Sequence, residues 1–477
     1  MAWDCPIDGT HCRHGVECEG PKAGPGASES GAYDAQERNN EGIWGMVSRR
    51  KFCAAVAGLS LYRSMVPAAC RAVALPGIDN PVAWQSGDWP WWRGPYFNGI
   101  AEAGQRAPEV WGPEEGVIWK TAIPGRGHGS PIVVGDQVLL EVADADRRVQ
   151  TLQCLDRATG VLRWETIIHR DGLDVKNNEK SSMASASPAF DGERFFVNFL
   201  SGDAVYMTAL DRSGKALWQT MLTKYVNHQG FGSSPLLYAD LVIGVSDNKG
   251  GGAVVAMDRR TGAEVWRRER PAKPNYPSPV IFNVGGKPQL FLTGCDLVTS
   301  LDPLTGKVQW EVEGATTECV TTTVTDGERI FTSGGYPKNH VSAVLADGSG
   351  KLAWENNSRT YVPSMVLHEG TLYAVLDAGV AICWDSATGE ELWKGRLGGT
   401  FSSSLVLVGD RIYATNEEGQ TFIYRASRQK LEIVAQNRLG ENVFSTPAIC
   451  GDRLYNRISI TENGKRQEYM VCVGQPG

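Results

Sequence analysis

The stretch Asp156–Trp164, DRATGVLRW, decides the fold of this chain because it recurs. In each copy an aspartate opens a short turn that ends in glycine, and a tryptophan stands four residues after that glycine. The further copies are DRSGKALW at Asp211–Trp218, DRRTGAEVW at Asp258–Trp266, DPLTGKVQW at Asp302–Trp310, DGSGKLAW at Asp347–Trp354 and DSATGEELW at Asp385–Trp393. Consecutive tryptophans are 54, 48, 44, 44 and 39 residues apart, near the period of a four-stranded propeller blade.

Two other series run in step with the tryptophans. A small hydroxyl residue stands where each new run of apolar alternation begins, and we expect it to mark the first strand of each blade. Its eight members are Ser130, Ser187, Ser234, Ser278, Thr322, Ser364, Ser403 and Thr446. Each is followed by a pair that supplies or tolerates the positive φ of a tight hairpin, for example Gly135-Asp136, Asp191-Gly192 and Gly451-Asp452.

The two ends of the repeat complete each other. The lone strand around Trp119 has no Asp-Thr-Gly turn before it, whereas the last repeat begins normally at Thr446 and lacks a final strand. The match of Leu439-Gly440 with Leu397-Gly398 places Ala435 in the tryptophan slot of the seventh repeat. If the strand at Trp119 completes the last blade, the ring closes. We therefore predict an all-β fold, an eight-bladed β-propeller of four-stranded antiparallel blades, closed by an N-terminal strand.

Each position of the motif has a structural reason. A tryptophan at one register of the outermost strand can wedge between neighbouring blades and bury roughly 150–250 Å². Such contacts hold together repeats that lack a shared core. The glycine adopts a left-handed conformation at low cost, and the aspartate bonds the backbone of its own turn. We therefore expect the periodic aspartates to be structural rather than catalytic.

The repeated pattern Ala/Cys-x-Asp-x-x-Thr-Gly-x-x-x-Trp resembles the repeat of pyrroloquinoline quinone (PQQ) type propellers over residues 117–473. This family contains quinoprotein alcohol dehydrogenases. It also contains non-catalytic exported propellers, such as the B-component lipoprotein of the outer-membrane β-barrel assembly machinery. The segment WPWWRGP at Trp89–Pro95 is similar to one that precedes the propeller in exported members. We expect residues 75–116 to form a Trp-rich leader that packs on the propeller surface.

The composition agrees with a strand-rich globular protein, with 55 glycines, 24 prolines and 15 tryptophans among 477 residues. The formal net charge is −7, and no stripe of Lys and Arg is present, which argues against a nucleic-acid partner. The densest basic group behind the N-terminal region is Arg267, Arg268 and Arg270, which we expect to solvate the end of an outer strand. We predict a monomer with no transmembrane span.

Residues 46–74 resemble an export signal. Ser48-Arg49-Arg50-Lys51-Phe52 matches the twin-arginine pattern, and the apolar stretch from Phe52 to Tyr62 has the length of a signal h-region but is too short for a bilayer span. An ordinary secretory signal with a basic end is the alternative. Cleavage after Ala74 and lipidation at Cys70 both stay open. The segment predicts an exported protein of the periplasm or cell envelope.

Residues 1–45 fit poorly in front of an export signal. We expect either a disordered leader or a true start at Met46. The Cys and His residues of this segment match no zinc pattern of defensible spacing, so we predict no metal site from Cys5, His11, Cys12, His14 and Cys18. Farther along, Cys154 and Cys383 each lie two residues before a motif aspartate, at a position where other blades have small residues, so we expect both to be small core residues. A disulfide between Cys450 and Cys472, which fall in one blade, stays open.

The loops that lead into the innermost strands form the expected binding region. In a propeller those strands line the central channel, and the loops crowd its mouth. The insertion between Ile167 and Ala186 is the longest departure from the repeat. Insertions of this kind distinguish one propeller from another and often lie on the binding face. The candidate ligand-binding residues at this channel mouth are Arg126, His128, Asn178, Lys180, His228, Phe231, Asn275, Tyr276, Glu318 and Tyr361. We assign no catalytic role among them.

Two functions fit this pattern. The first is an exported binding or scaffolding propeller that presents its rim to a protein, glycan or small molecule without turning it over. The second, which the resemblance implies, is a PQQ- and calcium-dependent dehydrogenase that oxidises alcohols or sugars. Dehydrogenases of the family hold the quinone against an adjacent cysteine pair, and this chain contains no such pair. Glu318 and Asn178 are of the calcium-binding type without matching neighbours. We therefore favour the non-catalytic function and assign no cofactor, and PQQ with calcium stays open as the alternative.

Overall fold

Alternation of apolar side chains and tight turns produces strands along the whole described chain. The computed structural model describes residues 82, 84–176 and 178–474, which lie within the unit Val66–Gly477. The leader predicted at 1–45 and the export signal predicted at 46–74 lie outside the described residues. Every regular element from β1 to β32 is a strand. No helix of the described ranges is long and apolar enough to cross a membrane.

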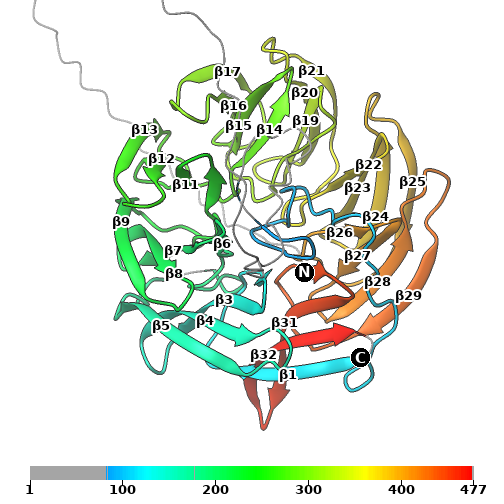
Figure 1. Cartoon of the computed structure of the whole chain (residues 1–477). Helices are drawn as coiled ribbons and strands as arrows, with labels where there is room; N and C mark the ends of the chain where they lie inside the picture. Colours follow the sequence, from blue (N-terminus) through cyan, green and yellow to red (C-terminus); the bar gives the residue numbers. More distant parts are fainter. Residues whose placement is uncertain (1–81, 83, 177, 475–477) are drawn as a thin grey trace, which may run out of the picture. The chain divides into compact units, whose positions relative to one another are not determined.

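The strands form eight four-stranded antiparallel sheets, which are the blades of a propeller (Figure 1). We number the blades in chain order and give their strands from the axis outward. Blade 1 contains β2 (Ile132–Val134), β3 (Gln137–Asp144), β4 (Val149–Asp156) and β5 (Leu162–Arg170). Blade 2 contains β6 (Ala189–Phe190), β7 (Arg194–Ser201), β8 (Ala204–Asp211) and β9 (Ala216–Lys224). Blade 3 contains β10 (Leu236–Tyr238), β11 (Leu241–Val245), β12 (Gly252–Asp258) and β13 (Glu264–Arg270).

The next four blades repeat this order. Blade 4 contains β14 (Val280–Val284), β15 (Lys287–Gly294), β16 (Leu297–Leu301) and β17 (Val308–Glu313). Blade 5 contains β18 (Val324–Thr325), β19 (Arg329–Gly334), β20 (His340–Leu345) and β21 (Leu352–Asn356). Blade 6 contains β22 (Val366–His368), β23 (Thr371–Leu376), β24 (Val380–Asp385) and β25 (Glu391–Arg396). Blade 7 contains β26 (Val406–Val408), β27 (Arg411–Thr415), β28 (Gln420–Arg425) and β29 (Ile433–Arg438).

Blade 8 joins the two ends of the chain. Its strands are β30 (Ala448–Cys450), β31 (Arg453–Glu462), β32 (Lys465–Gly474) and β1 (Val117–Ile123). β1 pairs antiparallel with β32, with Trp119 opposite Cys472, and Figure 1 shows the cyan β1 beside the red β32. In blade 7, Ala435 lies opposite Ile423 as Trp393 lies opposite Cys383 in blade 6. The predicted eight-bladed propeller with an N-terminal closing strand is confirmed.

The periodic tryptophans fasten most blades to the following blade. Trp119 of blade 8 donates its indole N–H to the carbonyl of Arg157 in blade 1 at 3.1 Å, and Gly160 of blade 1 lies against its ring. A Cβ at Gly160 would stand 2.5 Å from that ring, so the close approach requires glycine as much as the positive φ of 72° does. The same contact recurs at Gly214, Gly262, Gly306 and Gly389. The tryptophan of one blade and the motif turn of the following blade therefore form one contact between the two blades.

A ring of hydroxyl groups joins the innermost strands around the axis. In seven of the eight blades, the backbone N–H of the ring residue donates to the side-chain hydroxyl of its counterpart in the following blade. The links present are Ser130 to Ser187, Ser187 to Ser234, Ser234 to Ser278, Thr322 to Ser364, Ser364 to Ser404, Ser404 to Thr446 and Thr446 to Ser130, all at 2.9–3.0 Å. The member from blade 7 is Ser404, the neighbour of the expected Ser403.

The Trp-rich segment lies on the axis side of the innermost strands. Trp89 bridges to Val133 of β2, and Ile100 bridges to Leu407 of β26. Because the other edges of β2 and β26 are paired within their own blades, these bridges place the segment toward the ring axis. Figure 1 shows this blue segment inside the ring.

Arg93 anchors this segment between blades. Its side chain is 1% exposed, and it donates to the carbonyl oxygens of Asn98 at 2.7 Å, Leu405 at 3.3 Å and Ser364 at 3.4 Å. It also donates to the carbonyl of Met365. Four carbonyl dipoles therefore surround one buried guanidinium, which ties the segment to blades 6 and 7 at once.

The six cysteines between 154 and 472 are all buried and unpaired. Cys450 on β30 and Cys472 on β32 lie on either side of β31, so two strand spacings of about 4.8 Å separate them. A disulfide requires Cα atoms within about 7 Å, so this sheet order does not allow the bond that the sequence left open.

Candidate functional site

The channel mouth is made by two kinds of loop. Because the strands of a blade alternate in direction, the loops that enter each innermost strand lie on the same face as the loops between second and third strands. The turns that carry the Asp-Thr-Gly motif lie on the opposite face. Sequence reasoning considered only the first kind of loop, and this is why it missed Glu417, which lies between β27 and β28.

A buried carboxylate forms the centre of the first cluster at the mouth. Glu318, 5% exposed, lies in the loop before β18, and its Oε1 is 3.1 Å from Nε2 of His228 in the loop before β10. The hydroxyl of Tyr361, from the loop before β22, donates to Oε2 of Glu318 at 3.3 Å. Three loops from different blades therefore meet at one carboxylate.

Two tyrosines surround this carboxylate with protonated hydroxyls. Burial raises the pKa of Tyr361, and the neighbouring Glu318 adds to the rise. Burial likewise raises the pKa of Tyr276, with a further contribution from Glu318. The Tyr276 hydroxyl is buried beside the backbone of Gln229, and its proton has no acceptor among the described residues. A buried donor without a partner costs free energy, so this hydroxyl is suited to meet an acceptor on a ligand.

The second cluster lies at the loop before β2. His128 stacks on Phe444 with ring centroids 4.3 Å apart, and its Nε2 lies 3.3 Å from Nε of Arg126. Burial holds the pKa of His128 well below its usual range, and the charges of Arg126 and two further arginines add to this effect. The imidazole is therefore neutral at pH 7. It presents a flat ring and a hydrogen-bonding nitrogen rather than a charge.

The insertion after β5 crosses the mouth as a strap, which we define as residues 173–176 and 178–183. Asn178 donates its amide to Oε1 of Gln229 at 2.9 Å, and the carbonyl of Glu179 accepts a hydrogen bond from Arg126 at 2.8 Å. The Lys180 ammonium lies 2.8 Å from a carboxylate oxygen of Glu417 in blade 7. The strap thus begins between blades 1 and 2 and reaches blade 7.

Two of the predicted site residues lie beneath the mouth. Asn275, 7% exposed, donates to Asp247 at 3.0 Å and to the carbonyl of Thr293 at 2.8 Å. Phe231, 9% exposed, packs edge-on against Tyr225. These contacts support the loops from below. The other predicted residues fall into the Glu318 cluster (His228, Tyr276, Glu318, Tyr361), the His128 cluster (Arg126, His128) and the strap (Asn178, Lys180).

The residues at the mouth do not fit a calcium and quinone site. Both oxygens of the Glu318 carboxylate already contact protein donors, and the Asn178 amide is engaged by Gln229. The described residues contain no group of three or more His, Cys, Asp or Glu side chains placed to hold a metal ion. None of the six described cysteines is next to another in sequence, so no cysteine pair offers a stacking surface for a quinone.

Sequence comparison identifies one family. The family model described as "Outer membrane protein assembly factor BamB" matches residues 110–224, 148–394 and 337–455, which together span most of the propeller. No curated protein sequence shows a significant match to the chain.

Solved structures share the fold at low sequence identity. BamB from Moraxella catarrhalis is 15% identical with a TM-score of 0.53, and the match covers 74% of this chain and 99% of that chain. A europium-containing methanol dehydrogenase is 12% identical with a TM-score of 0.63, covering 82% and 98%. Quinohemoprotein alcohol dehydrogenase from Comamonas testosteroni is 14% identical with a TM-score of 0.60, covering 82% and 81%. Such similarity shows the fold and not the activity.

Proposed function

We propose, since the chain belongs to the family of the outer membrane protein assembly factor BamB, that it is a non-catalytic propeller that holds a ligand or partner at its channel mouth. We further propose that it is exported to the periplasm or cell envelope. The export signal predicted at residues 46–74 supports this location. The occupant of the mouth is a protein segment, a glycan or a small molecule with hydrogen-bonding groups.

One observation carries the non-catalytic proposal. The segment from Trp89 to Ala101 lies on the axis side of the innermost strands, in the channel where the resemblance to the dehydrogenases would place a quinone. Pro90, Trp89 and Ala101 bond to the backbone of β6, β2 and β26. The buried Arg93 fastens this segment to blades 6 and 7. The axis is therefore occupied by side chains that also hold the ring together.

The mouth offers chemistry suited to binding. Tyr276 is a donor because its raised pKa keeps it protonated, and the neutral His128 presents a ring face beside Phe444. Sites that combine apolar rings with a few placed polar groups bind small molecules and chain segments. The strap gives this mouth its own shape.

A direct experiment separates the two candidate functions. The purified protein is mixed with PQQ and calcium, desalted, and examined for quinone absorbance and for dye reduction with a panel of alcohols and sugars. We expect neither retained quinone nor turnover. Retained quinone together with turnover that Glu318→Gln abolishes would overturn the proposal and establish the dehydrogenase. Glu417→Gln, which alters the strap contact and leaves the Glu318 cluster intact, is the matched variant.

A further inference from the structure

The loop between β1 and β2 carries a cation across the boundary between blades 8 and 1. Arg126 in this loop bridges through its backbone to Ala143 of β3. Gly127 beside it donates its N–H to both carboxylate oxygens of Glu468 at 3.1 Å. Glu468 and Arg466 are two residues apart on β32, so their side chains point to the same face of blade 8. The loop therefore places Arg126 next to a charged face of blade 8.

Three guanidinium groups gather around one carboxylate at this boundary. Glu468 is 1% exposed and pairs with Arg457 at 2.6 Å and with Arg466. Arg126 makes no ion pair with a carboxylate of the described residues, and its Nη2 donates instead to the backbone carbonyl of Glu179 at 2.8 Å. The cluster of Arg126, Arg457, Arg466 and Glu468 therefore contains more positive than negative charge.

Acidic side chains nearby do not balance this charge. Glu141 on β3 is buried, and burial raises its pKa well above the usual range, so it is uncharged at pH 7. Asp144 accepts the backbone N–H of Arg147 at 3.0 Å and lies 3.7 Å from the guanidinium of the same residue. Glu417 pairs with Lys180 of the strap at 2.8 Å. The positive charge at the loop thus remains without a counter-charge.

Arg126 occupies a position at which an anion would be stabilising. Its side chain is half-buried, and removing a cation from water costs free energy unless an anion compensates it. Burial lowers the pKa of Arg126 and the charge of Arg466 lowers it further, whereas the charge of Glu468 acts in the opposite direction. Arg466 is 30% exposed, so its guanidinium is open to an incoming ligand.

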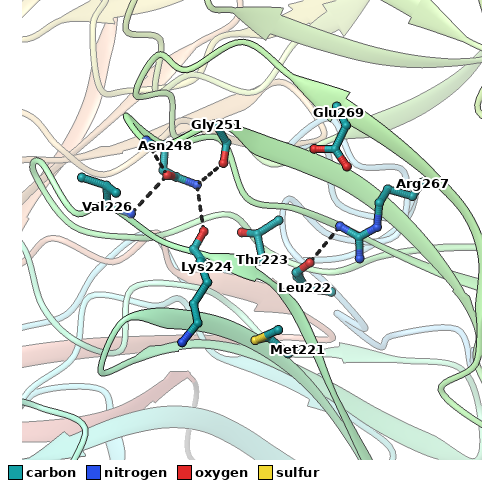
Figure 2. A pocket seen from close by; sticks show the side chains of 10 residues that line it. Met221, Leu222, Thr223, Lys224, Val226, Asn248, Gly251, Arg267 and Glu269 are labelled. Atoms are coloured by element: carbon teal, nitrogen blue, oxygen red, sulfur yellow. Dashed lines mark hydrogen bonds between the residues drawn. The ribbon is translucent and has the colours of Figure 1, made fainter.

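A groove elsewhere on the ring shows the contrast. It has a volume of about 430 Å³, lies between the outer strands of blades 2 and 3, and contains Arg267 and Lys224 (Figure 2). Arg267 pairs with Glu264 at 2.7 Å, and Lys224 pairs with Asp203 at 2.8 Å. Glu269 also lines this groove. Its charges are balanced within the chain, unlike those at the loop before β2.

We propose that Arg126 and Arg466 bind the carboxylate or phosphate group of a small acidic molecule at the channel mouth. A guanidinium offers several N–H donors in one plane, and these match the oxygens of either group. His128, whose Nε2 lies 3.3 Å from Nε of Arg126, stacks on Phe444 and offers an aromatic ring to the rest of the molecule. One charged group beside one ring suits a small molecule rather than an extended protein surface. This inference rests on the proposed binding function and names the class of its occupant.

Isothermal titration calorimetry with four probes tests the site. The purified protein, in a phosphate-free buffer of low salt, is titrated with inorganic phosphate, glucose 6-phosphate, glucuronate and glucose. The last three share a sugar ring and carry a phosphate, a carboxylate or neither. We expect at least one acid to bind about tenfold more tightly than glucose, because only an acid forms charge-assisted hydrogen bonds with the arginines. The acid that binds most tightly identifies the anionic group.

Variants locate the binding on the protein. Arg126→Gln and Arg466→Gln should each weaken binding of that acid by about tenfold or more, as expected for a lost charge-assisted hydrogen bond. Arg425→Gln is the matched control, because Arg425 lies at the end of β28 on the opposite face and pairs with Asp410 at 2.8 Å and Glu432 at 2.9 Å. It removes the same charge and should leave the affinity unchanged. Equal melting temperatures show an unchanged fold, and where one of the two site variants melts lower than the parent, the other decides.

Three results would overturn the anion site. These are acids that bind no more tightly than glucose, acids that bind both site variants as tightly as the parent, and an equal loss of affinity in Arg425→Gln. Failure here is distinct from failure of the proposed function. A protein that binds none of the acids and shows no turnover keeps the non-catalytic proposal with an occupant of another class. A protein that turns over alcohols with PQQ, yet binds acids through Arg126, loses the non-catalytic proposal and keeps the anion site.

Discussion

The indole N–H of Trp92 donates a hydrogen bond of 2.8 Å to the hydroxyl oxygen of Thr322. At every other position of the hydroxyl ring, that oxygen accepts the backbone N–H of the preceding blade. Between blades 4 and 5 the described residues lack this link, and the Trp-rich segment supplies the donor instead. The residue pair therefore connects the segment on the axis to the closure of the ring.

The first prediction concerns this pair. Thr322→Val preserves the shape of the side chain and leaves the Trp92 donor without its acceptor, so it should lower the free energy of unfolding by about 1–3 kcal/mol. Trp92→Phe removes the donor from the other side. In a double-mutant cycle measured by urea unfolding, the two changes should couple by about 0.5 kcal/mol or more. Strictly additive effects would show that the hydrogen bond contributes nothing.

Arg93 should be far more sensitive than an exposed arginine of the same segment. Arg93→Met leaves several buried carbonyl groups without donors and should lower the free energy of unfolding by about 3 kcal/mol or more. Arg106→Met, at an exposed position, is the matched control and should change it by less than about 0.5 kcal/mol. Similar midpoints for both variants in urea would contradict the anchoring role of Arg93.

The strap should loosen when its contact with blade 7 is removed. Lys180 is 54% exposed, and exposed ion pairs contribute at most about 1 kcal/mol, so Lys180→Ala should hardly change global stability. Amide hydrogen exchange of the strap should nevertheless become several-fold faster, because local opening needs less free energy. Lys394→Ala removes an exposed pair with Glu391 and is the control. Unchanged exchange in the strap would mean that the other contacts suffice to hold it.

Stability should fall as the pH is lowered from 7 to 4, and His340 should contribute to this fall. His340 is 1% exposed, and burial lowers its pKa from 6.5 to about 4, with Glu355 and Lys338 acting in opposite directions. The unfolded chain binds a proton near pH 6.5, whereas the folded chain does not until about pH 4. The stabilisation is therefore complete above pH 6.5 and is lost as the pH falls toward 4.

Substitution of His340 checks the sign of this dependence. His340→Gln should flatten the pH profile of the urea midpoint between pH 7 and pH 4. A single group shifted by this amount accounts for on the order of 3 kcal/mol across the window. A profile that stays equally steep in His340→Gln would assign the dependence to other groups.

Most of the architecture could be predicted from the sequence, because the spacing and residue types of a repeated motif indicate the strands and turns of each blade. The tryptophan at one register, the motif glycine and the hydroxyl at each first strand are periodic, and each marks a contact that recurs between neighbours, such as Trp119 against Gly160. Even the closure followed from two incomplete copies, the lone strand at Trp119 and the last repeat that begins at Thr446. The residue type at each periodic position is set by its contact with the neighbouring blade. The same requirement therefore appears several times in one sequence.

The site depended on contacts that occur once. Sequence alone predicted that the loops before the innermost strands meet at the mouth, but nothing in it paired Glu318 with His228 or carried Lys180 across to Glu417. It also offered no sign that Arg93 would be buried among carbonyls on the axis. The sequence by itself determined the repeating blades, since every copy contains the residues that its turn and its contact with the next blade require. The tertiary structure alone decided the mouth and the axis, because side chains far apart in the chain meet there only after the ring has closed.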